Sequence, residues 1–254
     1  MIKKKDSNSE YHSHDSISAS GLKIIYKKSV YHYLNREKFV STPAMNFGSA
    51  VHSILLEPEK KEILALPGNL NLRTKKDREY KKQLIEDNPD KIIVSGEEKE
   101  FLDQIVQNAM NNELANKLLF TLDEIEYSYY GTYEEVPVRI RPDGIKKGRY
   151  IIDIKTCQDA SPKAFRSAIY NYAYHLQAFF YSEMLGFDPS AFRFIAIENR
   201  YPFDVAVYSL SNDLIDRGKE AWRIAFDSWS EYIKHNRISG FHWADVNTDG
   251  SLIL

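Results

Sequence analysis

Cysteine is nearly absent from this sequence of 254 residues, and the only one is Cys157. A single thiol excludes a disulfide within the chain and an iron–sulfur cluster held by four of its own cysteines. Long apolar runs are missing too: stretches such as residues 54–56 fall far short of the roughly 20 residues that cross a bilayer. Residues 1–9 carry charge without an apolar stretch behind them, which argues against a secretory signal. We therefore expect a cytoplasmic protein without a membrane partner.

A strong excess of charge of one sign is also missing. The chain has 34 basic and 36 acidic residues and a net charge of −2, whereas strong nucleic-acid binders are usually basic overall. This balance does not exclude an enzyme in which a basic rim surrounds acidic metal ligands, because the two nearly cancel. Hydrophobic residues make up 43% and aromatic residues 13% of the chain, which is enough for a sizeable core.

Length and patterning predict a single domain over residues 16–240, between a flexible leader at 1–15 and a tail at 241–254. Within it, a helical portion is expected over 16–120 and a sheet core over 121–240. Helical spacing and capping residues predict helices over 18–26, 46–57, from 95 onward, 161–170, 172–186 and 212–235. Period-two alternation predicts strands over 123–131, 134–142 and 149–156, as an antiparallel meander, and then over 191–199 and 203–210. This order predicts an α/β fold of the α+β type, with a central mixed sheet flanked by helices.

The stretch 141–156, RPDGIKKGRYIIDIKT, carries the most informative pattern. Asp143 lies where the second predicted strand ends, and Asp153 and Lys155 are two residues apart on the third. Residues at i and i+2 share a face of a strand, so these two side chains should project together. An isolated D-x-K is most often a surface ion pair. A carboxylate and an ammonium on so apolar a strand are costly, however, unless they are paired or bind an ion.

This combination suits phosphodiester hydrolysis. Carboxylates from adjacent strands can chelate a hard cation such as Mg²⁺ or Mn²⁺, which stabilises the charge that builds on the phosphate. An ammonium beside them can position the attacking water and favour its hydroxide form. Pro142-Asp143 together with Asp153-Ile154-Lys155 matches the (P)D…(D/E)xK signature.

Two further motifs lie on predicted helices. Gly48 and His52 are four residues apart in FGSAVHSILLE, as are Gln177 and Tyr181 in YHLQAFFY. Taken singly, they are more often packed core residues. In the order G-x-x-x-H, D…D-x-K, Q-x-x-x-Y, the motifs resemble the RecB-like branch of the PD-(D/E)xK nuclease superfamily. The opening SASGLKIIYKKSVYHY and the segment GSAVHSILLEP resemble more narrowly the RecE-type exonucleases, also called exonuclease VIII.

The resemblance implies a role for each matching residue and a restriction-endonuclease-like core. His52, Asp143, Asp153 and the backbone carbonyl of Ile154 would bind Mg²⁺, for which Mn²⁺ could substitute. Lys155 would be the catalytic lysine.

Three further roles follow from the same resemblance. Gln177 would orient the lysine or the water, and Tyr181 would support its helix or contact DNA. Glu126 is a weaker candidate for an outer-shell or second-metal acid, because a solvated strand edge also explains it. The same explanation covers three acids near it in the sequence: Glu124, Glu134 and Glu135.

A basic segment is the best candidate for contact with the backbone of duplex DNA. Six of the ten residues from 73 to 82 are basic, among them Arg73, Lys75 and Lys76, and they lie on a predicted helix. A solvated helix face is the ordinary interpretation of such a run.

The resemblance also implies an activity. Nucleases of this type degrade linear duplex DNA from 5′ to 3′, often as ring-shaped oligomers, and supply a single-strand annealing protein during recombination. We therefore expect a Mg²⁺-dependent exodeoxyribonuclease of phage-type recombination, acting in a bacterial or phage-infected cell. A site- or structure-specific endonuclease on the same core and a catalytically silent DNA-binding module remain as alternatives.

Overall fold

The computed structural model describes residues 1–37, 42–60, 63–68, 70, 73–89, 91–238 and 240–241. Its largest sheet has five strands: β4 (Glu124–Ile125), β7 (Gly144–Lys146), β8 (Tyr150–Cys157), β9 (Phe192–Glu198) and β10 (Val205–Tyr208). Their order across the sheet is β10-β9-β8-β7-β4, with β8 and β9 parallel and the other neighbours antiparallel. The predicted α/β class with a central mixed sheet is confirmed.

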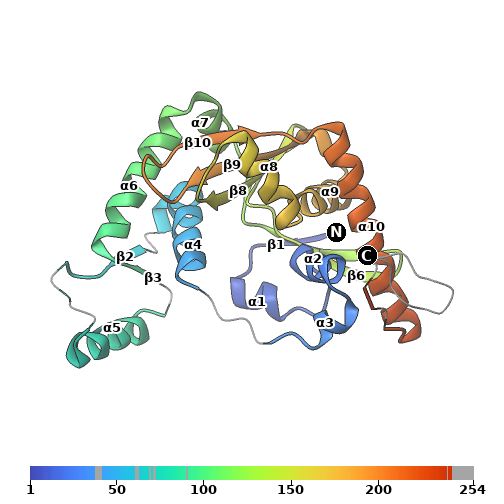
Figure 1. Ribbon diagram of the computed structural model, residues 1–254, viewed down its shortest axis with the longest axis horizontal. Coiled ribbons are helices and arrows are strands. Elements are labelled where there is room, and N and C mark those ends of the chain that lie inside the picture. The colour runs from blue at the N-terminus through green and yellow to red at the C-terminus, as the bar shows by residue number, and fades with distance from the viewer. Residues whose placement is uncertain are drawn as a thin grey trace.

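Helices cover both faces of this sheet (Figure 1). One group consists of α4 (Pro43–Leu56), α6 (Gly96–Asn111) and α7 (Glu113–Phe120), and the other of α2 (Ala19–Lys27), α8 (Pro162–Asn171), α9 (Tyr174–Leu185) and α10 (Asn212–His235). Strand side chains alternate between the two groups. In β9, Ile195 and Ile197 belong to the core beside the first group, whereas Phe194 and Ala196 belong to the core beside the second.

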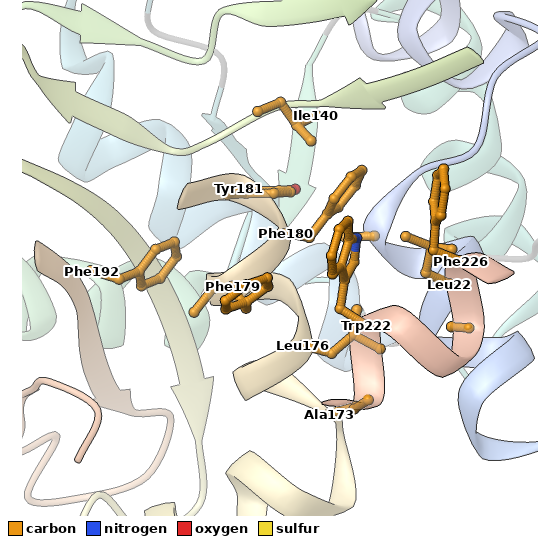
Figure 2. Packing of buried hydrophobic residues seen from close by; sticks show 14 of the residues in the cluster. Leu22, Ile140, Ala173, Leu176, Phe179, Phe180, Tyr181, Phe192, Trp222 and Phe226 are labelled. Carbon is orange, nitrogen blue, oxygen red and sulfur yellow. The ribbon is translucent and has the colours of Figure 1, made fainter. Parts of the chain in front are cut away.

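Helix α9 lies at the centre of the second core (Figure 2). Every residue from His175 to Ser182 is buried, so the helix is enclosed on all sides. Phe179 packs against Trp222 of α10, with ring centroids 5.3 Å apart. A polar side chain on α9 therefore has to find its partner inside the protein, and Gln177 is such a residue.

Capping residues explain most helix bounds. Ser18 accepts a hydrogen bond from a backbone N–H in the first turn of α2, and Ser95 forms a capping box with Glu98 at the start of α6. Gly186 ends α9 in the left-handed conformation, as predicted. Helix α4 begins three residues before the predicted 46–57 because Thr42 caps it.

The predicted three-strand meander is confirmed for the antiparallel pairing of its first two strands and is wrong for the third. The strand expected over 123–131 breaks at Glu126, which has a φ of 53°. The part after the break, β5 (Ser128–Tyr133), pairs with β6 (Val136–Ile140) in a second sheet. Strand β8 pairs instead with β7, across a turn at Gly148 with a φ of 66°. Alternation shows which residues are extended, but the break at Glu126 decides which strands meet.

The leader, expected to be flexible, is part of the fold. Strand β1 (Ile2–Lys4) pairs with β5, which completes a sheet of order β1-β5-β6, and α1 (Asn8–Ser13) follows it. Asp6 pairs with the largely buried guanidinium of Arg141, with Nη2 and Oδ1 2.6 Å apart. A buried cation needs a carboxylate partner, and this requirement is not visible in the polar composition of the leader. The expected tail lies outside the described residues from 242 onward.

The remaining elements were not predicted, except for the helix that carries the basic segment. They are α3 (Val30–Leu34), β2 (Ile63–Ala65), α5 (Lys75–Asp87) and β3 (Ile92–Val94), with two short 3₁₀ turns at Pro58–Lys60 and Pro189–Ala191. Strands β2 and β3 form a small parallel sheet. None of the helices that the structure describes combines the length and apolar composition needed to cross a lipid bilayer.

Replacing Asp6 by Asn is expected to loosen residues 2–13. Burial acts to raise the pKa of Asp6, but hydrogen bonds from Ser128, Tyr130 and Arg141 lower it from 3.8 to about 2. Because the folded pKa is the lower one, the carboxylate stabilises the fold above pH 3.8, and this contribution is lost as the pH falls through about 2. Hydrogen exchange of residues 2–13 at neutral pH should be faster in the variant, whereas Asp216→Asn on the exposed face of α10 should leave it unchanged. Equal protection in both variants would contradict the anchoring role.

Candidate active site

Asp153 and Lys155 lie on one face of β8, as predicted, and pair with each other. Asp153 Oδ2 and Lys155 Nζ are 2.5 Å apart, while Ile152 and Ile154 pack in the core on the opposite face. The side chain of Asp153 is 2% exposed and that of Lys155 18% exposed. The pair is therefore buried, unlike the surface ion pair that commonly accounts for D-x-K.

Asp143 lies between β6 and β7 and reaches the same stretch of β8. Its Oδ2 atom accepts a hydrogen bond of 2.6 Å from the backbone N–H of Ile154, and the residue is 8% exposed. Asp143 thus contacts β8 at Ile154, the residue that follows Asp153.

The G-x-x-x-H motif places His52 against β8. A Cβ atom on Gly48 would lie 3.2 Å from Thr156 Oγ1, so the glycine allows α4 to approach the strand closely. His52 Nε2 lies 3.0 Å from the carbonyl oxygen of Ile154. Four helical residues rise by about 6 Å and two strand residues by about 6.6 Å. The spacing of the motif therefore matches two residues of β8.

Glu126 completes a cluster with His52 and Asp143. One ligand atom of each residue lies within 4.8 Å of the others, and His52 Nδ1 is 3.5 Å from Asp143 Oδ2 and 3.8 Å from Glu126 Oε1. The positive φ that breaks the strand belongs to Glu126 itself. The other three acids considered with it have basic partners elsewhere: Glu124 pairs with Lys3 and Lys147, Glu134 with Arg223, and Glu135 with Lys234.

The cluster has the donor set of a divalent cation site. It offers two carboxylates and an imidazole beside the backbone carbonyl of Ile154, and oxygen-rich sets suit Mg²⁺ and Mn²⁺. Asp153 lies next to it but outside the group of three. Its Oδ2 atom is buried and, apart from the ion pair with Lys155, has no hydrogen-bond partner among the described residues.

The positive charge of His52 offsets the negative charges of Glu126 and Asp143. Nε2 faces a carbonyl oxygen and Nδ1 faces two carboxylates, so both ring nitrogens are placed to donate. Burial acts to lower the pKa of His52, but Asp143 and Glu126 raise it to about 10. The imidazolium therefore supplies the positive charge that the acids need.

The pKa values of the two acids of the signature, Asp143 and Asp153, shift in opposite directions. Burial acts to raise the pKa of Asp143, but His52 and Lys155 hold it below its usual value. Burial raises the pKa of Asp153. The charge of Lys155 opposes this rise, and the charge of Asp143 adds to it. Burial acts to lower the pKa of Lys155, but both acids raise it, so it remains an ammonium. Neighbouring acids with opposite shifts are typical of functional sites.

Gln177 contacts the acid of the D-x-K motif rather than its lysine. Gln177 Nε2 donates to Asp153 Oδ1 at 2.5 Å, and the residue is 6% exposed. Its Oε1 atom accepts a hydrogen bond of 2.5 Å from Lys23 Nζ on α2. The sequence does not mark Lys23 as a site residue, because one lysine on an amphipathic helix carries no signal of its own.

Tyr181 lies behind the site, inside the protein. It is 6% exposed and packs beside Phe180 and Phe192 (Figure 2). This placement favours support of the helix over contact with DNA.

The basic segment is not brought to the cluster. Helix α5 projects at one end of the molecule beyond β2 and β3 (Figure 1). Arg73, Lys75 and Lys76 are exposed, and Lys75 pairs with Glu79 one turn away. Cys157 is half-buried, and burial raises the pKa of its thiol to about 11.

Comparison with known proteins supports the same fold. Residues 18–238 match the family model of a PDDEXK-like domain of unknown function (DUF3799). No curated protein matches the sequence. The crystal structure of a candidate exonuclease from Eubacterium rectale is similar with a TM-score of 0.58 and 13% identity, over 94% of this chain and 90% of that one. A phage-related exonuclease from Haemophilus somnus 129PT covers 91% of this chain and 100% of its own at 15% identity, but its TM-score of 0.36 is too low to argue from.

His52 is expected to be protonated at neutral pH in the metal-free protein. Its pKa of about 10 exceeds the ordinary 6.5, so its stabilising contribution is complete below pH 6.5 and is lost as the pH rises through about 10. Asp143→Asn removes one of the two facing carboxylates and should lower that pKa, and Mg²⁺ should compete with the proton. NMR titration of the His52 imidazole measures these effects. A midpoint near 6.5 in the unmodified protein would refute the charge balance.

Proposed function

The chain belongs to the family of PDDEXK-like domains, and from this premise we propose that it is a metal-dependent exonuclease of linear double-stranded DNA. The supporting observation is that His52 and Asp143 contact the backbone of β8 beside the buried Asp153–Lys155 pair, and that Glu126 joins them in one cluster. The finer parts of the proposal rest on the resemblance in sequence. They are a RecE-type enzyme, 5′-to-3′ polarity, a ring-shaped homo-oligomer, an annealing partner and a role in phage-type recombination in a bacterial cytoplasm.

His52, Glu126, Asp143 and the carbonyl of Ile154 would hold the cation, with Mg²⁺ preferred and Mn²⁺ able to substitute. When bound, such a cation neutralises charge building on the phosphate and acidifies a water molecule. Asp153 remains a candidate ligand because its buried Oδ2 atom has no hydrogen-bond partner among the described residues apart from the ion pair with Lys155.

Lys155 would act on the reacting phosphate as a donor and not as a base. Its raised pKa keeps the proton on the amine, so it can donate hydrogen bonds to the attacking water and to the phosphate oxygens. Asp153 restrains the ammonium through the 2.5 Å ion pair, and Gln177 holds the other oxygen of Asp153. These contacts preorganise the lysine before the substrate arrives.

Two other functions remain as outcomes of the tests. A site- or structure-specific endonuclease would use the same residues without needing a DNA end. A silent DNA-binding module would have no chemical use for a buried lysine paired with an acid beside a metal-type cluster, and this observation ranks it lower.

The purified protein is expected to digest linear duplex DNA in the presence of Mg²⁺ and to leave a covalently closed circle intact. End-labelled duplexes, with the label at either 5′ or 3′ ends, also report the polarity, which should be 5′ to 3′. Cleavage of the closed circle would support the endonuclease instead. An absence of Mg²⁺- or Mn²⁺-dependent cleavage on every substrate would support the silent module.

Asp153→Ala and Lys155→Ala are each expected to reduce Mg²⁺-dependent digestion by about a hundredfold or more, because each removes a group aimed at the reacting phosphate or its cation. His52→Ala should instead raise the Mg²⁺ concentration needed for half-maximal rate, by about 10- to 100-fold. Exposed Lys219→Ala on α10 is the matched control and should behave as the unmodified protein. Near-normal rates for the Asp153 or Lys155 variant would remove them from the site.

A further inference from the structure

Lys23 is linked to the proposed catalytic lysine through a chain of three short contacts. Its Nζ atom donates to Gln177 Oε1 at 2.5 Å, Gln177 Nε2 donates to Asp153 Oδ1 at 2.5 Å, and Asp153 Oδ2 pairs with Lys155 Nζ at 2.5 Å. The chain joins α2, α9 and β8, whose residues are far apart in the sequence. All four side chains are removed from bulk water to a large degree.

A lysine at position 23 determines the orientation of the Gln177 amide. Protonated Lys23 only donates hydrogen bonds and the Asp153 carboxylate only accepts them, so the amide oxygen faces Lys23 and the amide nitrogen faces Asp153. Gln177 is buried, and without Lys23 its oxygen would lose the donor that the structure shows. The amide could then turn, and Asp153 would no longer receive a fixed hydrogen bond on Oδ1.

The position of Lys23 is electrostatically costly, which argues against a merely structural lysine. Lys23 Nζ and Lys155 Nζ lie 5.0 Å and 4.8 Å from the ring centroid of Tyr174, so two like charges share one aromatic ring. Burial and the charge of Lys155 lower the pKa of Lys23 to about 7, although Asp153 opposes the shift. An apolar residue of similar length would fill the space without this penalty.

We propose that Lys23 is a positioning residue of the active site, which acts through Gln177 to hold the Asp153 carboxylate and thereby the Lys155 ammonium. The contribution to catalysis rests on the proposed nuclease function, but the contacts themselves do not. Lys27, one turn further on α2, donates to the backbone carbonyl of Asn171 and not to the site. It therefore controls for the general docking of α2.

The first test needs no catalytic activity. The side-chain amide resonances of Gln177, measured by NMR in the metal-free protein, should shift in Lys23→Met and stay in place in Lys27→Met. Lys23→Arg, which keeps a donor at the position, should retain resonances close to those of the unmodified protein. Unchanged Gln177 resonances in folded Lys23→Met, or an equal shift in Lys27→Met, would overturn the proposal.

The second test is a double-mutant cycle on the rate of digestion of linear duplex DNA. Lys23→Met and Gln177→Leu should each lower kcat by about tenfold or more at little changed KM. Because Lys23 acts through Gln177, the double variant should lose little more than Gln177→Leu alone. If the two losses in kcat multiply in the double variant, or if Lys23→Met raises only KM, Lys23 contributes to DNA binding independently of Gln177. Either result would contradict the proposal. If the unmodified protein digests no DNA, the proposed function fails, while the amide resonances still decide the role of Lys23.

Discussion

The backbone of Ile154 is the point on which the site depends. Its N–H donates to Asp143 and its carbonyl oxygen faces His52, so one residue of β8 contacts both an acid and an imidazole from two other parts of the chain. The parallel pairing of β8 with β9 fixes that residue inside the sheet. Groups attached to a hydrogen-bonded strand have little freedom, and this is the rigidity that a catalytic arrangement needs.

Charge balance is the second constraint. Three acids, Glu126, Asp143 and Asp153, lie in surroundings with little water, and such carboxylates are stable only with nearby positive charge. His52, Lys155 and Lys23 supply it, one from α4, one from β8 and one from α2. The site is therefore assembled from most of the length of the chain, because both layers of helices contribute a cation to it.

The likeness to the Eubacterium rectale structure at 13% identity shows a shared fold and no more. The link to nuclease chemistry comes from residues of this chain. They are the cluster of His52, Glu126 and Asp143, which has the ligands of a divalent cation site, and the Lys155 ammonium paired with a buried acid. The basic segment on α5 lies away from this set and is partly neutralised within its own helix. The net charge of −2 agrees with a local rather than a general attraction for DNA.

The sequence by itself determined most of the longer helices and strands and the shared face of Asp153 and Lys155, because periodicity and caps are local properties of the chain. It also singled out His52, Asp143 and Gln177 through their spacing. Only the tertiary structure decided that β8 pairs with β7 rather than β6, that Glu126 is the acid among four that reaches His52, and that Lys23 belongs to the site. These are contacts between residues distant in sequence, and they depend on one left-handed residue and on the docking of helices, neither of which leaves a local pattern.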